Sequence, residues 1–281
     1  MKKVAIQGVS GAFHEIAARE FFQGEEIDIL PCTTFKELFQ SLADDDSLLG
    51  IVAIENTIAG SLLQNHNLLR ESGCTVIGEH KLRIEHNLAV LPGQKIEDID
   101  EVYSHPIALM QCEDFLDAHR HIKAIESEDT ALSAKDIADN KLTRRGAICS
   151  SLAAEKYGLE IIAKGIETNK RNFTRFLIIA EPKLAEELTK GVVLNKSSLV
   201  FTLPHEEGSL AKVLSILSFY HVNLTKIQSL PIIGEEWKYQ FYINLTFNDY
   251  TRYRQSLEAI IPLTKDFQIL GEYKEAATPV A

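Results

Sequence analysis

Residues 3–22, KVAIQGVSGAFHEIAAREFF, contain the pattern that decides the fold of the first half of the chain. The apolar run Val4–Ile6 predicts a buried strand, Gly8–Gly11 predicts a turn, and Ala12–Phe22 places apolar residues at helical spacing. A strand followed by a turn and an amphipathic helix is the unit that builds parallel sheets covered by helices. Because this alternation continues along residues 3–181, we predict an α/β fold for them.

The segments that follow supply further strands and helices. Thr34 followed by Glu37 predicts a capping box at the start of a helix. Leu49–Ile54 predicts a buried strand. Apolar residues alternate from Leu82 to Val90, which predicts one longer strand that crosses between two lobes. His86 has the inward parity of that strand, and we interpret it as a core histidine with satisfied polar atoms.

The segment around Pro106 predicts a helix, because proline suits the first helical position. We expect this helix to run to Ala118. Ser104 and Gln111 are seven residues apart, a spacing that would put them on one helical face. Without other information, Ser104 is expected only to cap the helix. The remaining elements predicted here are a helix near Thr130, a strand at Ala147–Cys149, a helix through Ser151 that stops at Gly158, and extended structure over Ile161–Ala180.

The last third of the sequence predicts a second domain. Glu181–Lys196 is charged and polar, as expected for a surface linker with one short helix. Strands and helices then follow in the order βαββαβ, at Leu199–Leu203, Gly208–Tyr220, Leu224–Ile233, Lys238–Phe247, Tyr250–Ile261 and Phe267–Tyr273. That order gives an antiparallel sheet with both helices on one face, an α+β fold.

Composition excludes several classes of protein. In the 281 residues, 45% are hydrophobic and 25% charged, which is typical of a globular protein. The formal net charge of −11 opposes binding to nucleic acids or anionic membranes, so we expect neither as a partner. The four cysteines are scattered singly, as in reduced cytoplasmic proteins. We also find no signal peptide or membrane anchor, and we expect a cytoplasmic protein.

Cofactor motifs are not found in the sequence. The nine histidines lack the spacing of metal ligands. Gly8 and Gly11 alone do not make a dinucleotide-binding fingerprint. We therefore expect neither a metal nor an organic cofactor.

Several motifs resemble those of the prephenate dehydratases. Ile54, Glu55 and Asn56 lead into Gly60, Val102–Cys112 reads VYSHPIALMQC, and Asn172–Phe176 reads NFTRF. In the second domain, GSLAKVL beginning at Gly208 and NLTKIQSLP beginning at Asn223 resemble the ACT domain with which those enzymes sense phenylalanine. The resemblance covers nearly the whole chain.

The resemblance implies a specific domain organisation. The catalytic domain, residues 1–181, would have two α/β lobes around a cleft, as in type II periplasmic solute-binding proteins. Residues from about 1 to 80 and 165 to 181 would form one lobe, and residues from about 81 to 164 the other. A linker over 182–196 would join this domain to an ACT regulatory domain over 197–276. ACT units usually pair edge to edge, which implies self-association as a dimer or tetramer.

The activity implied is the decarboxylating dehydration of prephenate to phenylpyruvate, a step of L-phenylalanine biosynthesis that needs no cofactor. Thr174 matches the family position that donates to the departing hydroxyl or orders its proton donor. Asn56, Ser104 and Gln111 match positions of the substrate site. Two alternatives stay open, namely an arogenate dehydratase and a noncatalytic amino-acid sensor.

Arg175 and Phe176 complete the catalytic motif, but each has a second interpretation. In a regular strand Thr174 and Phe176 share one face, and Arg175 points to the other. Arg175 therefore either binds the pyruvyl carboxylate of the substrate or pairs with a carboxylate of the protein. Phe176 either keeps the site dry or packs in the core.

The resemblance also implies L-phenylalanine as a feedback inhibitor. The regulatory residues by similarity are Gly208, Ser209, Leu210, Ala211, Asn223, Gln228, Ser229, Leu230 and Pro231. Gln228 and Leu230 stand where the family's ESRP motif has glutamate and arginine. The alternative for this domain is a purely structural role in dimerisation.

Overall fold

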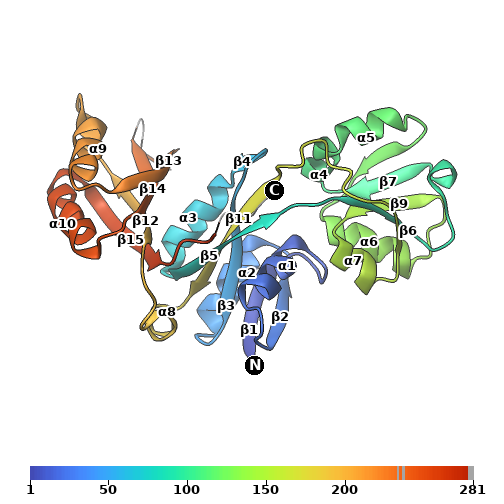
Figure 1. The fold of residues 1–281 in the computed structure, drawn as a ribbon, viewed down its shortest axis with the longest axis horizontal. Coiled ribbons are helices and arrows are strands. Elements are labelled where there is room, and N and C mark those ends of the chain that lie inside the picture. The colour runs from blue at the N-terminus through green and yellow to red at the C-terminus, as the bar shows by residue number, and fades with distance from the viewer. Residues whose placement is uncertain (233, 236–237, 278–281) are drawn as a thin grey trace. The chain divides into compact units, whose positions relative to one another are not determined.

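In the computed structural model, which describes residues 1–232, 234–235 and 238–277, the run Val4–Ile6 lies in the first strand of a six-stranded sheet. The strand order is β2-β1-β3-β11-β5, with β4 paired to β3 (Figure 1). Strands β2 and β3 run parallel to β1, as the strand and helix alternation predicted. The elements are β1 (Lys2–Gln7), α1 (Phe13–Phe21), β2 (Ile27–Cys32), α2 (Phe35–Asp44), β3 (Leu49–Asn56), β4 (Gly60–Ser61), α3 (Leu63–Ser72), β5 (Thr75–Arg83) and β11 (Phe173–Ala180).

A second, five-stranded sheet has the order β10-β6-β9-β7-β8. It is mixed, because β7 runs parallel to β8 and β9, whereas β6 runs antiparallel to β9 and β10. Small and branched residues of α6, α7 and β9 form its core on one side. The elements are β6 (Asn87–Val90), η1 (Ile96–Asp98), β7 (Glu101–Ser104), α4 (Pro106–Gln111), α5 (Glu113–Ala118), β8 (Lys123–Glu126), α6 (Thr130–Asp139), β9 (Arg145–Cys149), α7 (Ser151–Lys156) and β10 (Glu160–Ala163).

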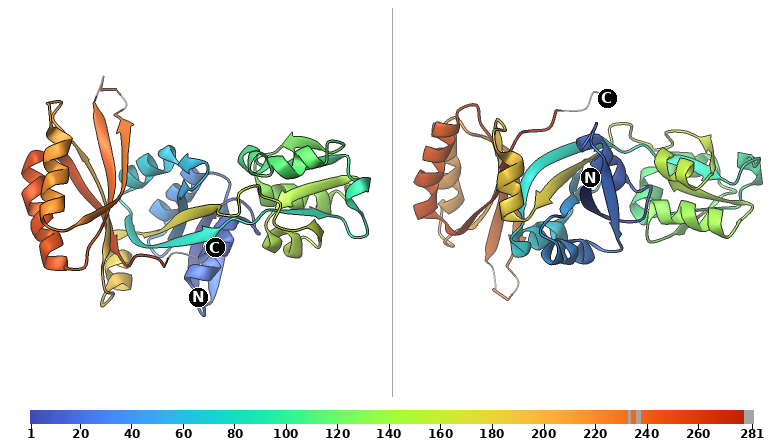
Figure 2. Two further views of the ribbon diagram at one scale, coloured as in Figure 1. Left: turned by 45° about the horizontal axis from the view of Figure 1, so that its top comes forward. Right: turned by 90° about the horizontal axis from the view of Figure 1, so that it is seen from below.

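The third sheet has four antiparallel strands in the order β13-β14-β12-β15. Helices α9 and α10 lie on the same face of it, and both contribute to one apolar core (Figure 2). The order β12-α9-β13-β14-α10-β15 confirms the predicted βαββαβ sequence of elements. The elements are α8 (Pro182–Thr189), β12 (Lys196–Thr202), α9 (Ser209–Phe219), β13 (Asn223–Pro231), β14 (Tyr239–Thr246), α10 (Tyr250–Ile260), η2 (Ile261–Leu263) and β15 (Lys265–Tyr273). Ile233, the predicted end of the second strand, lies outside the described residues.

The chain divides into two compact units. One contains residues 1–62 and 80–176, and the other contains residues 63–79 and 177–277. Helix α3 thus belongs with the third sheet, where Gln240 Nε2 donates to Asn67 Oδ1 at 2.7 Å. The predicted domain boundaries after residues 181 and 196 stay a prediction.

Two predicted elements are interrupted in the structure. The single strand expected over Leu82–Val90 is two strands, β5 and β6, which belong to different sheets. The helix expected from Pro106 to Ala118 is two short helices that meet at Cys112. In both places the apolar spacing continues across the break, so periodicity alone could not reveal it.

The capping box predicted at the start of α2 forms only in part. Thr34 Oγ1 accepts the N–H of Glu37 at 3.1 Å, as expected. The Glu37 carboxylate accepts instead from Thr33 N, at 2.6 Å, one residue before the N-cap. Among the described residues, no helix combines the length and the apolar character needed to cross a bilayer.

Candidate active site

Asn56, the last residue of β3, has a side chain whose orientation is fixed by its own turn. Its Oδ1 accepts the backbone N–H groups of Ile58 at 2.9 Å and Ala59 at 2.8 Å. Only an amide oxygen can accept these two donors, so the amide nitrogen must point the other way. That nitrogen donates to Asn172 Oδ1 at 2.8 Å and to Thr174 Oγ1 at 3.0 Å.

Asn172 and Gln111 close a ring of three carboxamides with Asn56. Asn172 Nδ2 donates to Gln111 Oε1 at 2.8 Å, and Gln111 Nε2 approaches Asn56 Oδ1 at 3.4 Å. All three side chains are buried. We call Asn56, Gln111 and Asn172 the carboxamide network. Burial makes each of these hydrogen bonds costly to break, because an unpaired amide would be left without water.

His86 adjoins this network through Gln111. The ring Nε2 lies 2.9 Å from Gln111 Oε1, which is an acceptor, so Nε2 carries the proton. Burial lowers the pKa of His86, against smaller opposing effects of the Gln111 hydrogen bond and the Glu167 carboxylate. Within the described chain Nδ1 has no hydrogen-bond partner, so the prediction of a fully satisfied histidine is wrong.

Thr174 lies in β11 with 9% of its surface exposed, beside Asn56. Its Oγ1 accepts a hydrogen from Asn56 Nδ2. Among the described residues, none takes the hydroxyl hydrogen of Thr174 in return. The hydroxyl is therefore free to donate to a bound molecule, which is the chemistry expected of this residue.

Arg175 and Phe176 follow the alternation of a regular strand. Arg175 Nη1 lies 3.8 Å from Glu55 Oε2, in agreement with the alternative in which it pairs with a carboxylate of the protein. Phe176 is 1% exposed and meets the ring of His14 edge-on, with 5.0 Å between ring centroids. Burial lowers the pKa of His14 to about 3, so this contact involves two uncharged rings. Phe176 is thus a core residue.

Ser104 does not join the carboxamide network through any hydrogen bond described. It is the last residue of β7, and its hydroxyl donates to the carbonyl of Ile148 at 2.6 Å. The helical spacing inferred between Ser104 and Gln111 is wrong, because only Gln111 lies on α4. The prediction that Ser104 caps this helix is also wrong, since His105 is the N-cap and its Nδ1 accepts from Ile107 N.

The structure therefore unites Asn56, Gln111 and Thr174, and adds two residues that the sequence did not assign to the site. Asn172 was part of the NFTRF motif, but nothing in that motif indicates where its amide points. The inward parity of His86 in the sequence indicated burial, but a buried histidine is more often a core residue, so the sequence did not place it beside the site. No group of three or more His, Cys, Asp or Glu side chains within the described ranges is arranged to hold a metal ion.

The predicted regulatory residues occupy two places in the third sheet. Gly208, with a φ of 76°, is the N-cap of α9, which Ser209, Leu210 and Ala211 begin. Asn223 and Gln228–Pro231 all lie in β13, the outer strand of the sheet, where Leu230 is buried and Ser229 exposed.

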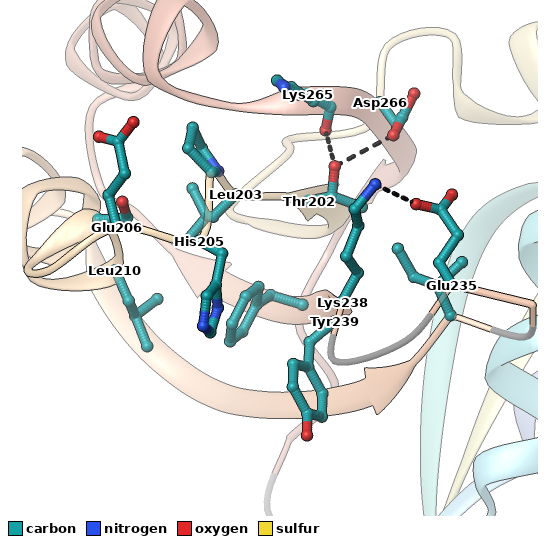
Figure 3. A pocket seen from close by; sticks show the side chains of 14 residues that line it. Thr202, Leu203, His205, Glu206, Leu210, Glu235, Lys238, Tyr239, Lys265 and Asp266 are labelled. Atoms are coloured by element: carbon teal, nitrogen blue, oxygen red, sulfur yellow. Dashed lines mark hydrogen bonds and ion pairs between the residues drawn. The ribbon is translucent and has the colours of Figure 1, made fainter.

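A surface pocket of about 400 Å³ lies beside the start of α9 (Figure 3). Ser209 and Leu210 line it, together with Leu203 and Phe241. Charged side chains are present as well, among them Lys265 and the Glu235–Lys238 pair. The pocket thus combines apolar surface with groups of both charge signs.

The chain is similar to known prephenate and arogenate dehydratases. The family model for prephenate dehydratase matches residues 4–184. Arogenate dehydratase 5 of Arabidopsis thaliana is 34% identical over 99% of this chain and 68% of the relative. The bifunctional chorismate mutase/prephenate dehydratase of Aquifex aeolicus is 33% identical over 98% of this chain and 74% of the relative.

Solved structures show the same fold. The prephenate dehydratase of Staphylococcus aureus has a TM-score of 0.81 and 25% identity, over 98% of this chain and 100% of its own. The Arthrobacter aurescens enzyme in complex with L-Phe has a TM-score of 0.85 and 24% identity, over 99% and 93% of the two chains. GqqA, a quorum quenching acylase, has a TM-score of 0.85 and 28% identity, over 98% of each chain. Since the family model matches well over half of the sequence and the curated relatives span nearly all of it, the chain belongs to the prephenate dehydratase family of hydro-lyases.

Proposed function

We propose that this enzyme removes water and carbon dioxide from prephenate to give phenylpyruvate, in L-phenylalanine biosynthesis, with Thr174 at the departing hydroxyl. The observation that carries the proposal is the direction of one hydrogen bond. Asn56 Nδ2 donates to Thr174 Oγ1 at 3.0 Å, so the hydroxyl of Thr174 has its own hydrogen to give. The family match supports the reaction class.

The reaction requires such a donor because hydroxide is a poor leaving group. The bond to the departing carboxylate breaks and its electron pair enters the ring. The C–O bond at the opposite ring carbon then breaks, and the oxygen leaves as water after taking a proton. Aromatisation supplies the driving force. A hydrogen bond from Thr174 that strengthens as the oxygen gains negative charge lowers the barrier to this step.

The neighbouring residues orient the substrate. Asn56 and Gln111 are neutral amides, suited to hydrogen bonding rather than to proton transfer. Ser104 can act towards a substrate only as an acceptor while its hydrogen is held by Ile148 O. We assign the pyruvyl carboxylate to Arg175, which would exchange its Glu55 partner for the substrate. Pairing the departing carboxylate instead would stabilise the ground state and slow its loss. Phe176 supports the strand from the core.

The test is turnover by purified protein, with variants of Thr174. Wild type should convert prephenate to phenylpyruvate. Thr174→Val, which keeps the shape but lacks the hydroxyl, should lower kcat by about 10² to 10⁴-fold, whereas Thr174→Ser should retain much of it. Equal turnover by wild type and the valine variant would remove Thr174 from the mechanism. An unreactive but folded wild type would favour a noncatalytic amino-acid sensor.

Arogenate is a second candidate substrate, favoured by the 34% identity to an arogenate dehydratase. The same elimination would then yield phenylalanine directly. Parallel assays with the two substrates decide between them, and a larger kcat/KM for arogenate would overturn our choice. Acyl hydrolysis, the activity of GqqA, is less well supported. The network beside Thr174 consists of amides, and the Nε2 of His86 is engaged by Gln111.

We further propose that residues 1–181 form a two-lobed catalytic domain and residues 197–276 an ACT domain that binds L-phenylalanine. Separate six- and five-stranded sheets support the two lobes, and the βαββαβ order supports the ACT assignment. The position of β13 as an outer strand of the sheet supports self-association as a dimer or tetramer by edge pairing.

The start of α9 is the proposed effector site. Helix N-termini attract carboxylates, and Leu210 and Phe241 in the pocket offer apolar surface for an aromatic ring. The Arthrobacter aurescens enzyme was solved in complex with L-Phe. Calorimetric titration should show binding of L-phenylalanine but not of D-phenylalanine, with loss of activity on binding. Failure of both effects would leave this domain a structural dimerisation unit.

A further inference from the structure

We propose that Asn172 is a positioning residue that keeps the Thr174 hydroxyl a hydrogen-bond donor, acting through Asn56. This inference rests on the proposed function, because it assigns a purpose to the donor at Thr174. Asn172 touches no reacting atom in the proposal. Its effect depends on the fixed direction of each hydrogen bond in the carboxamide network.

The direction is set at one end by backbone groups. The two N–H donors of Ile58 and Ala59 hold Asn56 Oδ1, so the hydrogens on Asn56 Nδ2 must find acceptors elsewhere. Asn172 Oδ1 and Thr174 Oγ1 take these hydrogens at 2.8 Å and 3.0 Å. Thr174 is thereby kept as the acceptor of this bond, and its own hydrogen stays available.

The direction at the other end follows from the same backbone donors, because the Asn56 Oδ1 that they fix accepts from Gln111 Nε2 and so turns Gln111 Oε1 towards Asn172 and His86. The Nε2–H of His86 and the Nδ2 of Asn172 both donate to Gln111 Oε1, at 2.9 Å and 2.8 Å. With its nitrogen directed to Gln111, Asn172 must present its oxygen to Asn56. Asn172 is wholly buried, so water cannot replace either bond. Its carboxamide must donate on one side, to Gln111, and accept on the other, from Asn56.

The substitution Asn172→Asp tests this requirement, because its effect should depend on protonation. A protonated carboxyl group can accept from Asn56 and donate to Gln111 Oε1, as the amide does. An ionised carboxylate can only accept, and would face Gln111 Oε1 with no hydrogen between them. Burial raises the pKa of a carboxyl group, so both forms should be accessible in an ordinary pH range. Two other titratable groups lie near the carboxamide network. His86 contacts it through Gln111, and Glu167 accepts from His86 N at 3.0 Å.

The experiment is the pH profile of kcat for prephenate in wild type, Asn172→Asp and Asn172→Ala, with the uncatalysed rate subtracted. At pH 8 the aspartate variant should lose at least about tenfold in kcat, with a smaller change in KM. This loss should shrink as the pH falls towards 5.5. The alanine variant should be impaired equally at every pH, and it serves on its own if the aspartate variant does not fold at pH 8.

The matched control is Asn169→Asp, the same chemical change in the same loop. Asn169 is exposed and its Oδ1 accepts from Arg171 N, a bond that a carboxylate keeps. This variant should behave as wild type. Unchanged kcat in both Asn172 variants, or a loss in the aspartate variant that does not depend on pH, would overturn the inference while leaving the proposed function intact. A wild type without turnover would overturn both.

Discussion

Two buried polar clusters lie in the unit of residues 1–62 and 80–176, and they replace the hydrogen bonds lost to water in different ways. The carboxamide network uses neutral amides that satisfy one another. The second, which we call the Glu15 cluster, surrounds the fully buried Glu15 carboxylate with Arg19, Lys156 and the N–H of Gly11. It links α1 to α7, whereas the carboxamide network lies beside Thr174.

The difference between them is electrostatic. Burial alone would raise the pKa of Glu15, but hydrogen bonds from Lys156, Gly11 and Arg19 bring it down to about 2. The ion is thus retained because hydrogen-bond donors of the protein replace its water. The carboxamides of the network do not titrate, so their hydrogen-bond directions persist across pH. A charged cluster suits a structural link, and a neutral one suits the fixed orientation of a donor.

The largest effect we expect is from Asn56→Asp. The carboxylate would still accept from Ile58 and Ala59, but its second oxygen would accept the hydrogen of Thr174 instead of donating to it. The donor at the leaving hydroxyl would be lost, and kcat should fall by about 10² to 10⁴-fold. Steady-state kinetics with prephenate measures this. A kcat within threefold of wild type would mean that the bond direction does not matter.

Glu15→Gln should act on stability instead. A carboxyl pKa lowered from 4.5 to about 2 corresponds to about 3 kcal/mol of folding free energy at neutral pH. Because the folded-state pKa is depressed, this contribution is present above pH 4.5 and is lost as the pH falls towards 2. Urea unfolding should show the difference between variant and wild type at pH 7 and its decline in acid.

The control for this prediction is Asp139→Asn, which removes the ion pair with Lys135. That pair is also short, at 2.6 Å, but both side chains are about half exposed to solvent. Its removal should leave the midpoint of unfolding almost unchanged. An equal loss in the two variants would mean that burial does not set the strength of the Glu15 cluster.

Gly11→Ala should destabilise the same link by a steric clash. Gly11 has a φ of 93°, and an added Cβ would come within 2.7 Å of Ala153 Cα. Gly24 has a similar φ of 87° but open space around it. Gly24→Ala should therefore cost about 1 kcal/mol from backbone strain, and Gly11→Ala about 1 to 3 kcal/mol more from the clash. The difference in thermal unfolding between the two alanine variants measures the effect of the close approach of Gly11 to Ala153.

The smallest effect concerns His86. Since burial lowers its pKa, we expect the ring to stay neutral at pH 7, with the proton on Nε2. Nitrogen NMR of histidine-labelled protein reports the tautomer. A proton on Nδ1 alone would make Nε2 an acceptor and reverse the hydrogen bond to Gln111. A charged ring would mean that a titrating group contacts the carboxamide network, and the two clusters would then no longer differ in their response to pH.

The sequence by itself predicted the elements whose signals are local. Pro106 begins α4, and the βαββαβ order of the last domain follows from its apolar periods. Such signals involve residues within one or two helical turns, so one chain segment contains all the information they need. The motif residues Asn56, Gln111 and Thr174 also came from the sequence, by resemblance.

Only the tertiary structure decided how those residues meet and which others join them. Asn56 and Asn172 are 116 positions apart, and Asn172 and Gln111 are 61 apart. A carboxamide can donate or accept on either side, so its residue type does not reveal the direction of its bonds. The breaks near His86 and at Cys112 likewise depend on which sheet or helix each flank joins. These features are set by packing between distant segments, which no local pattern records.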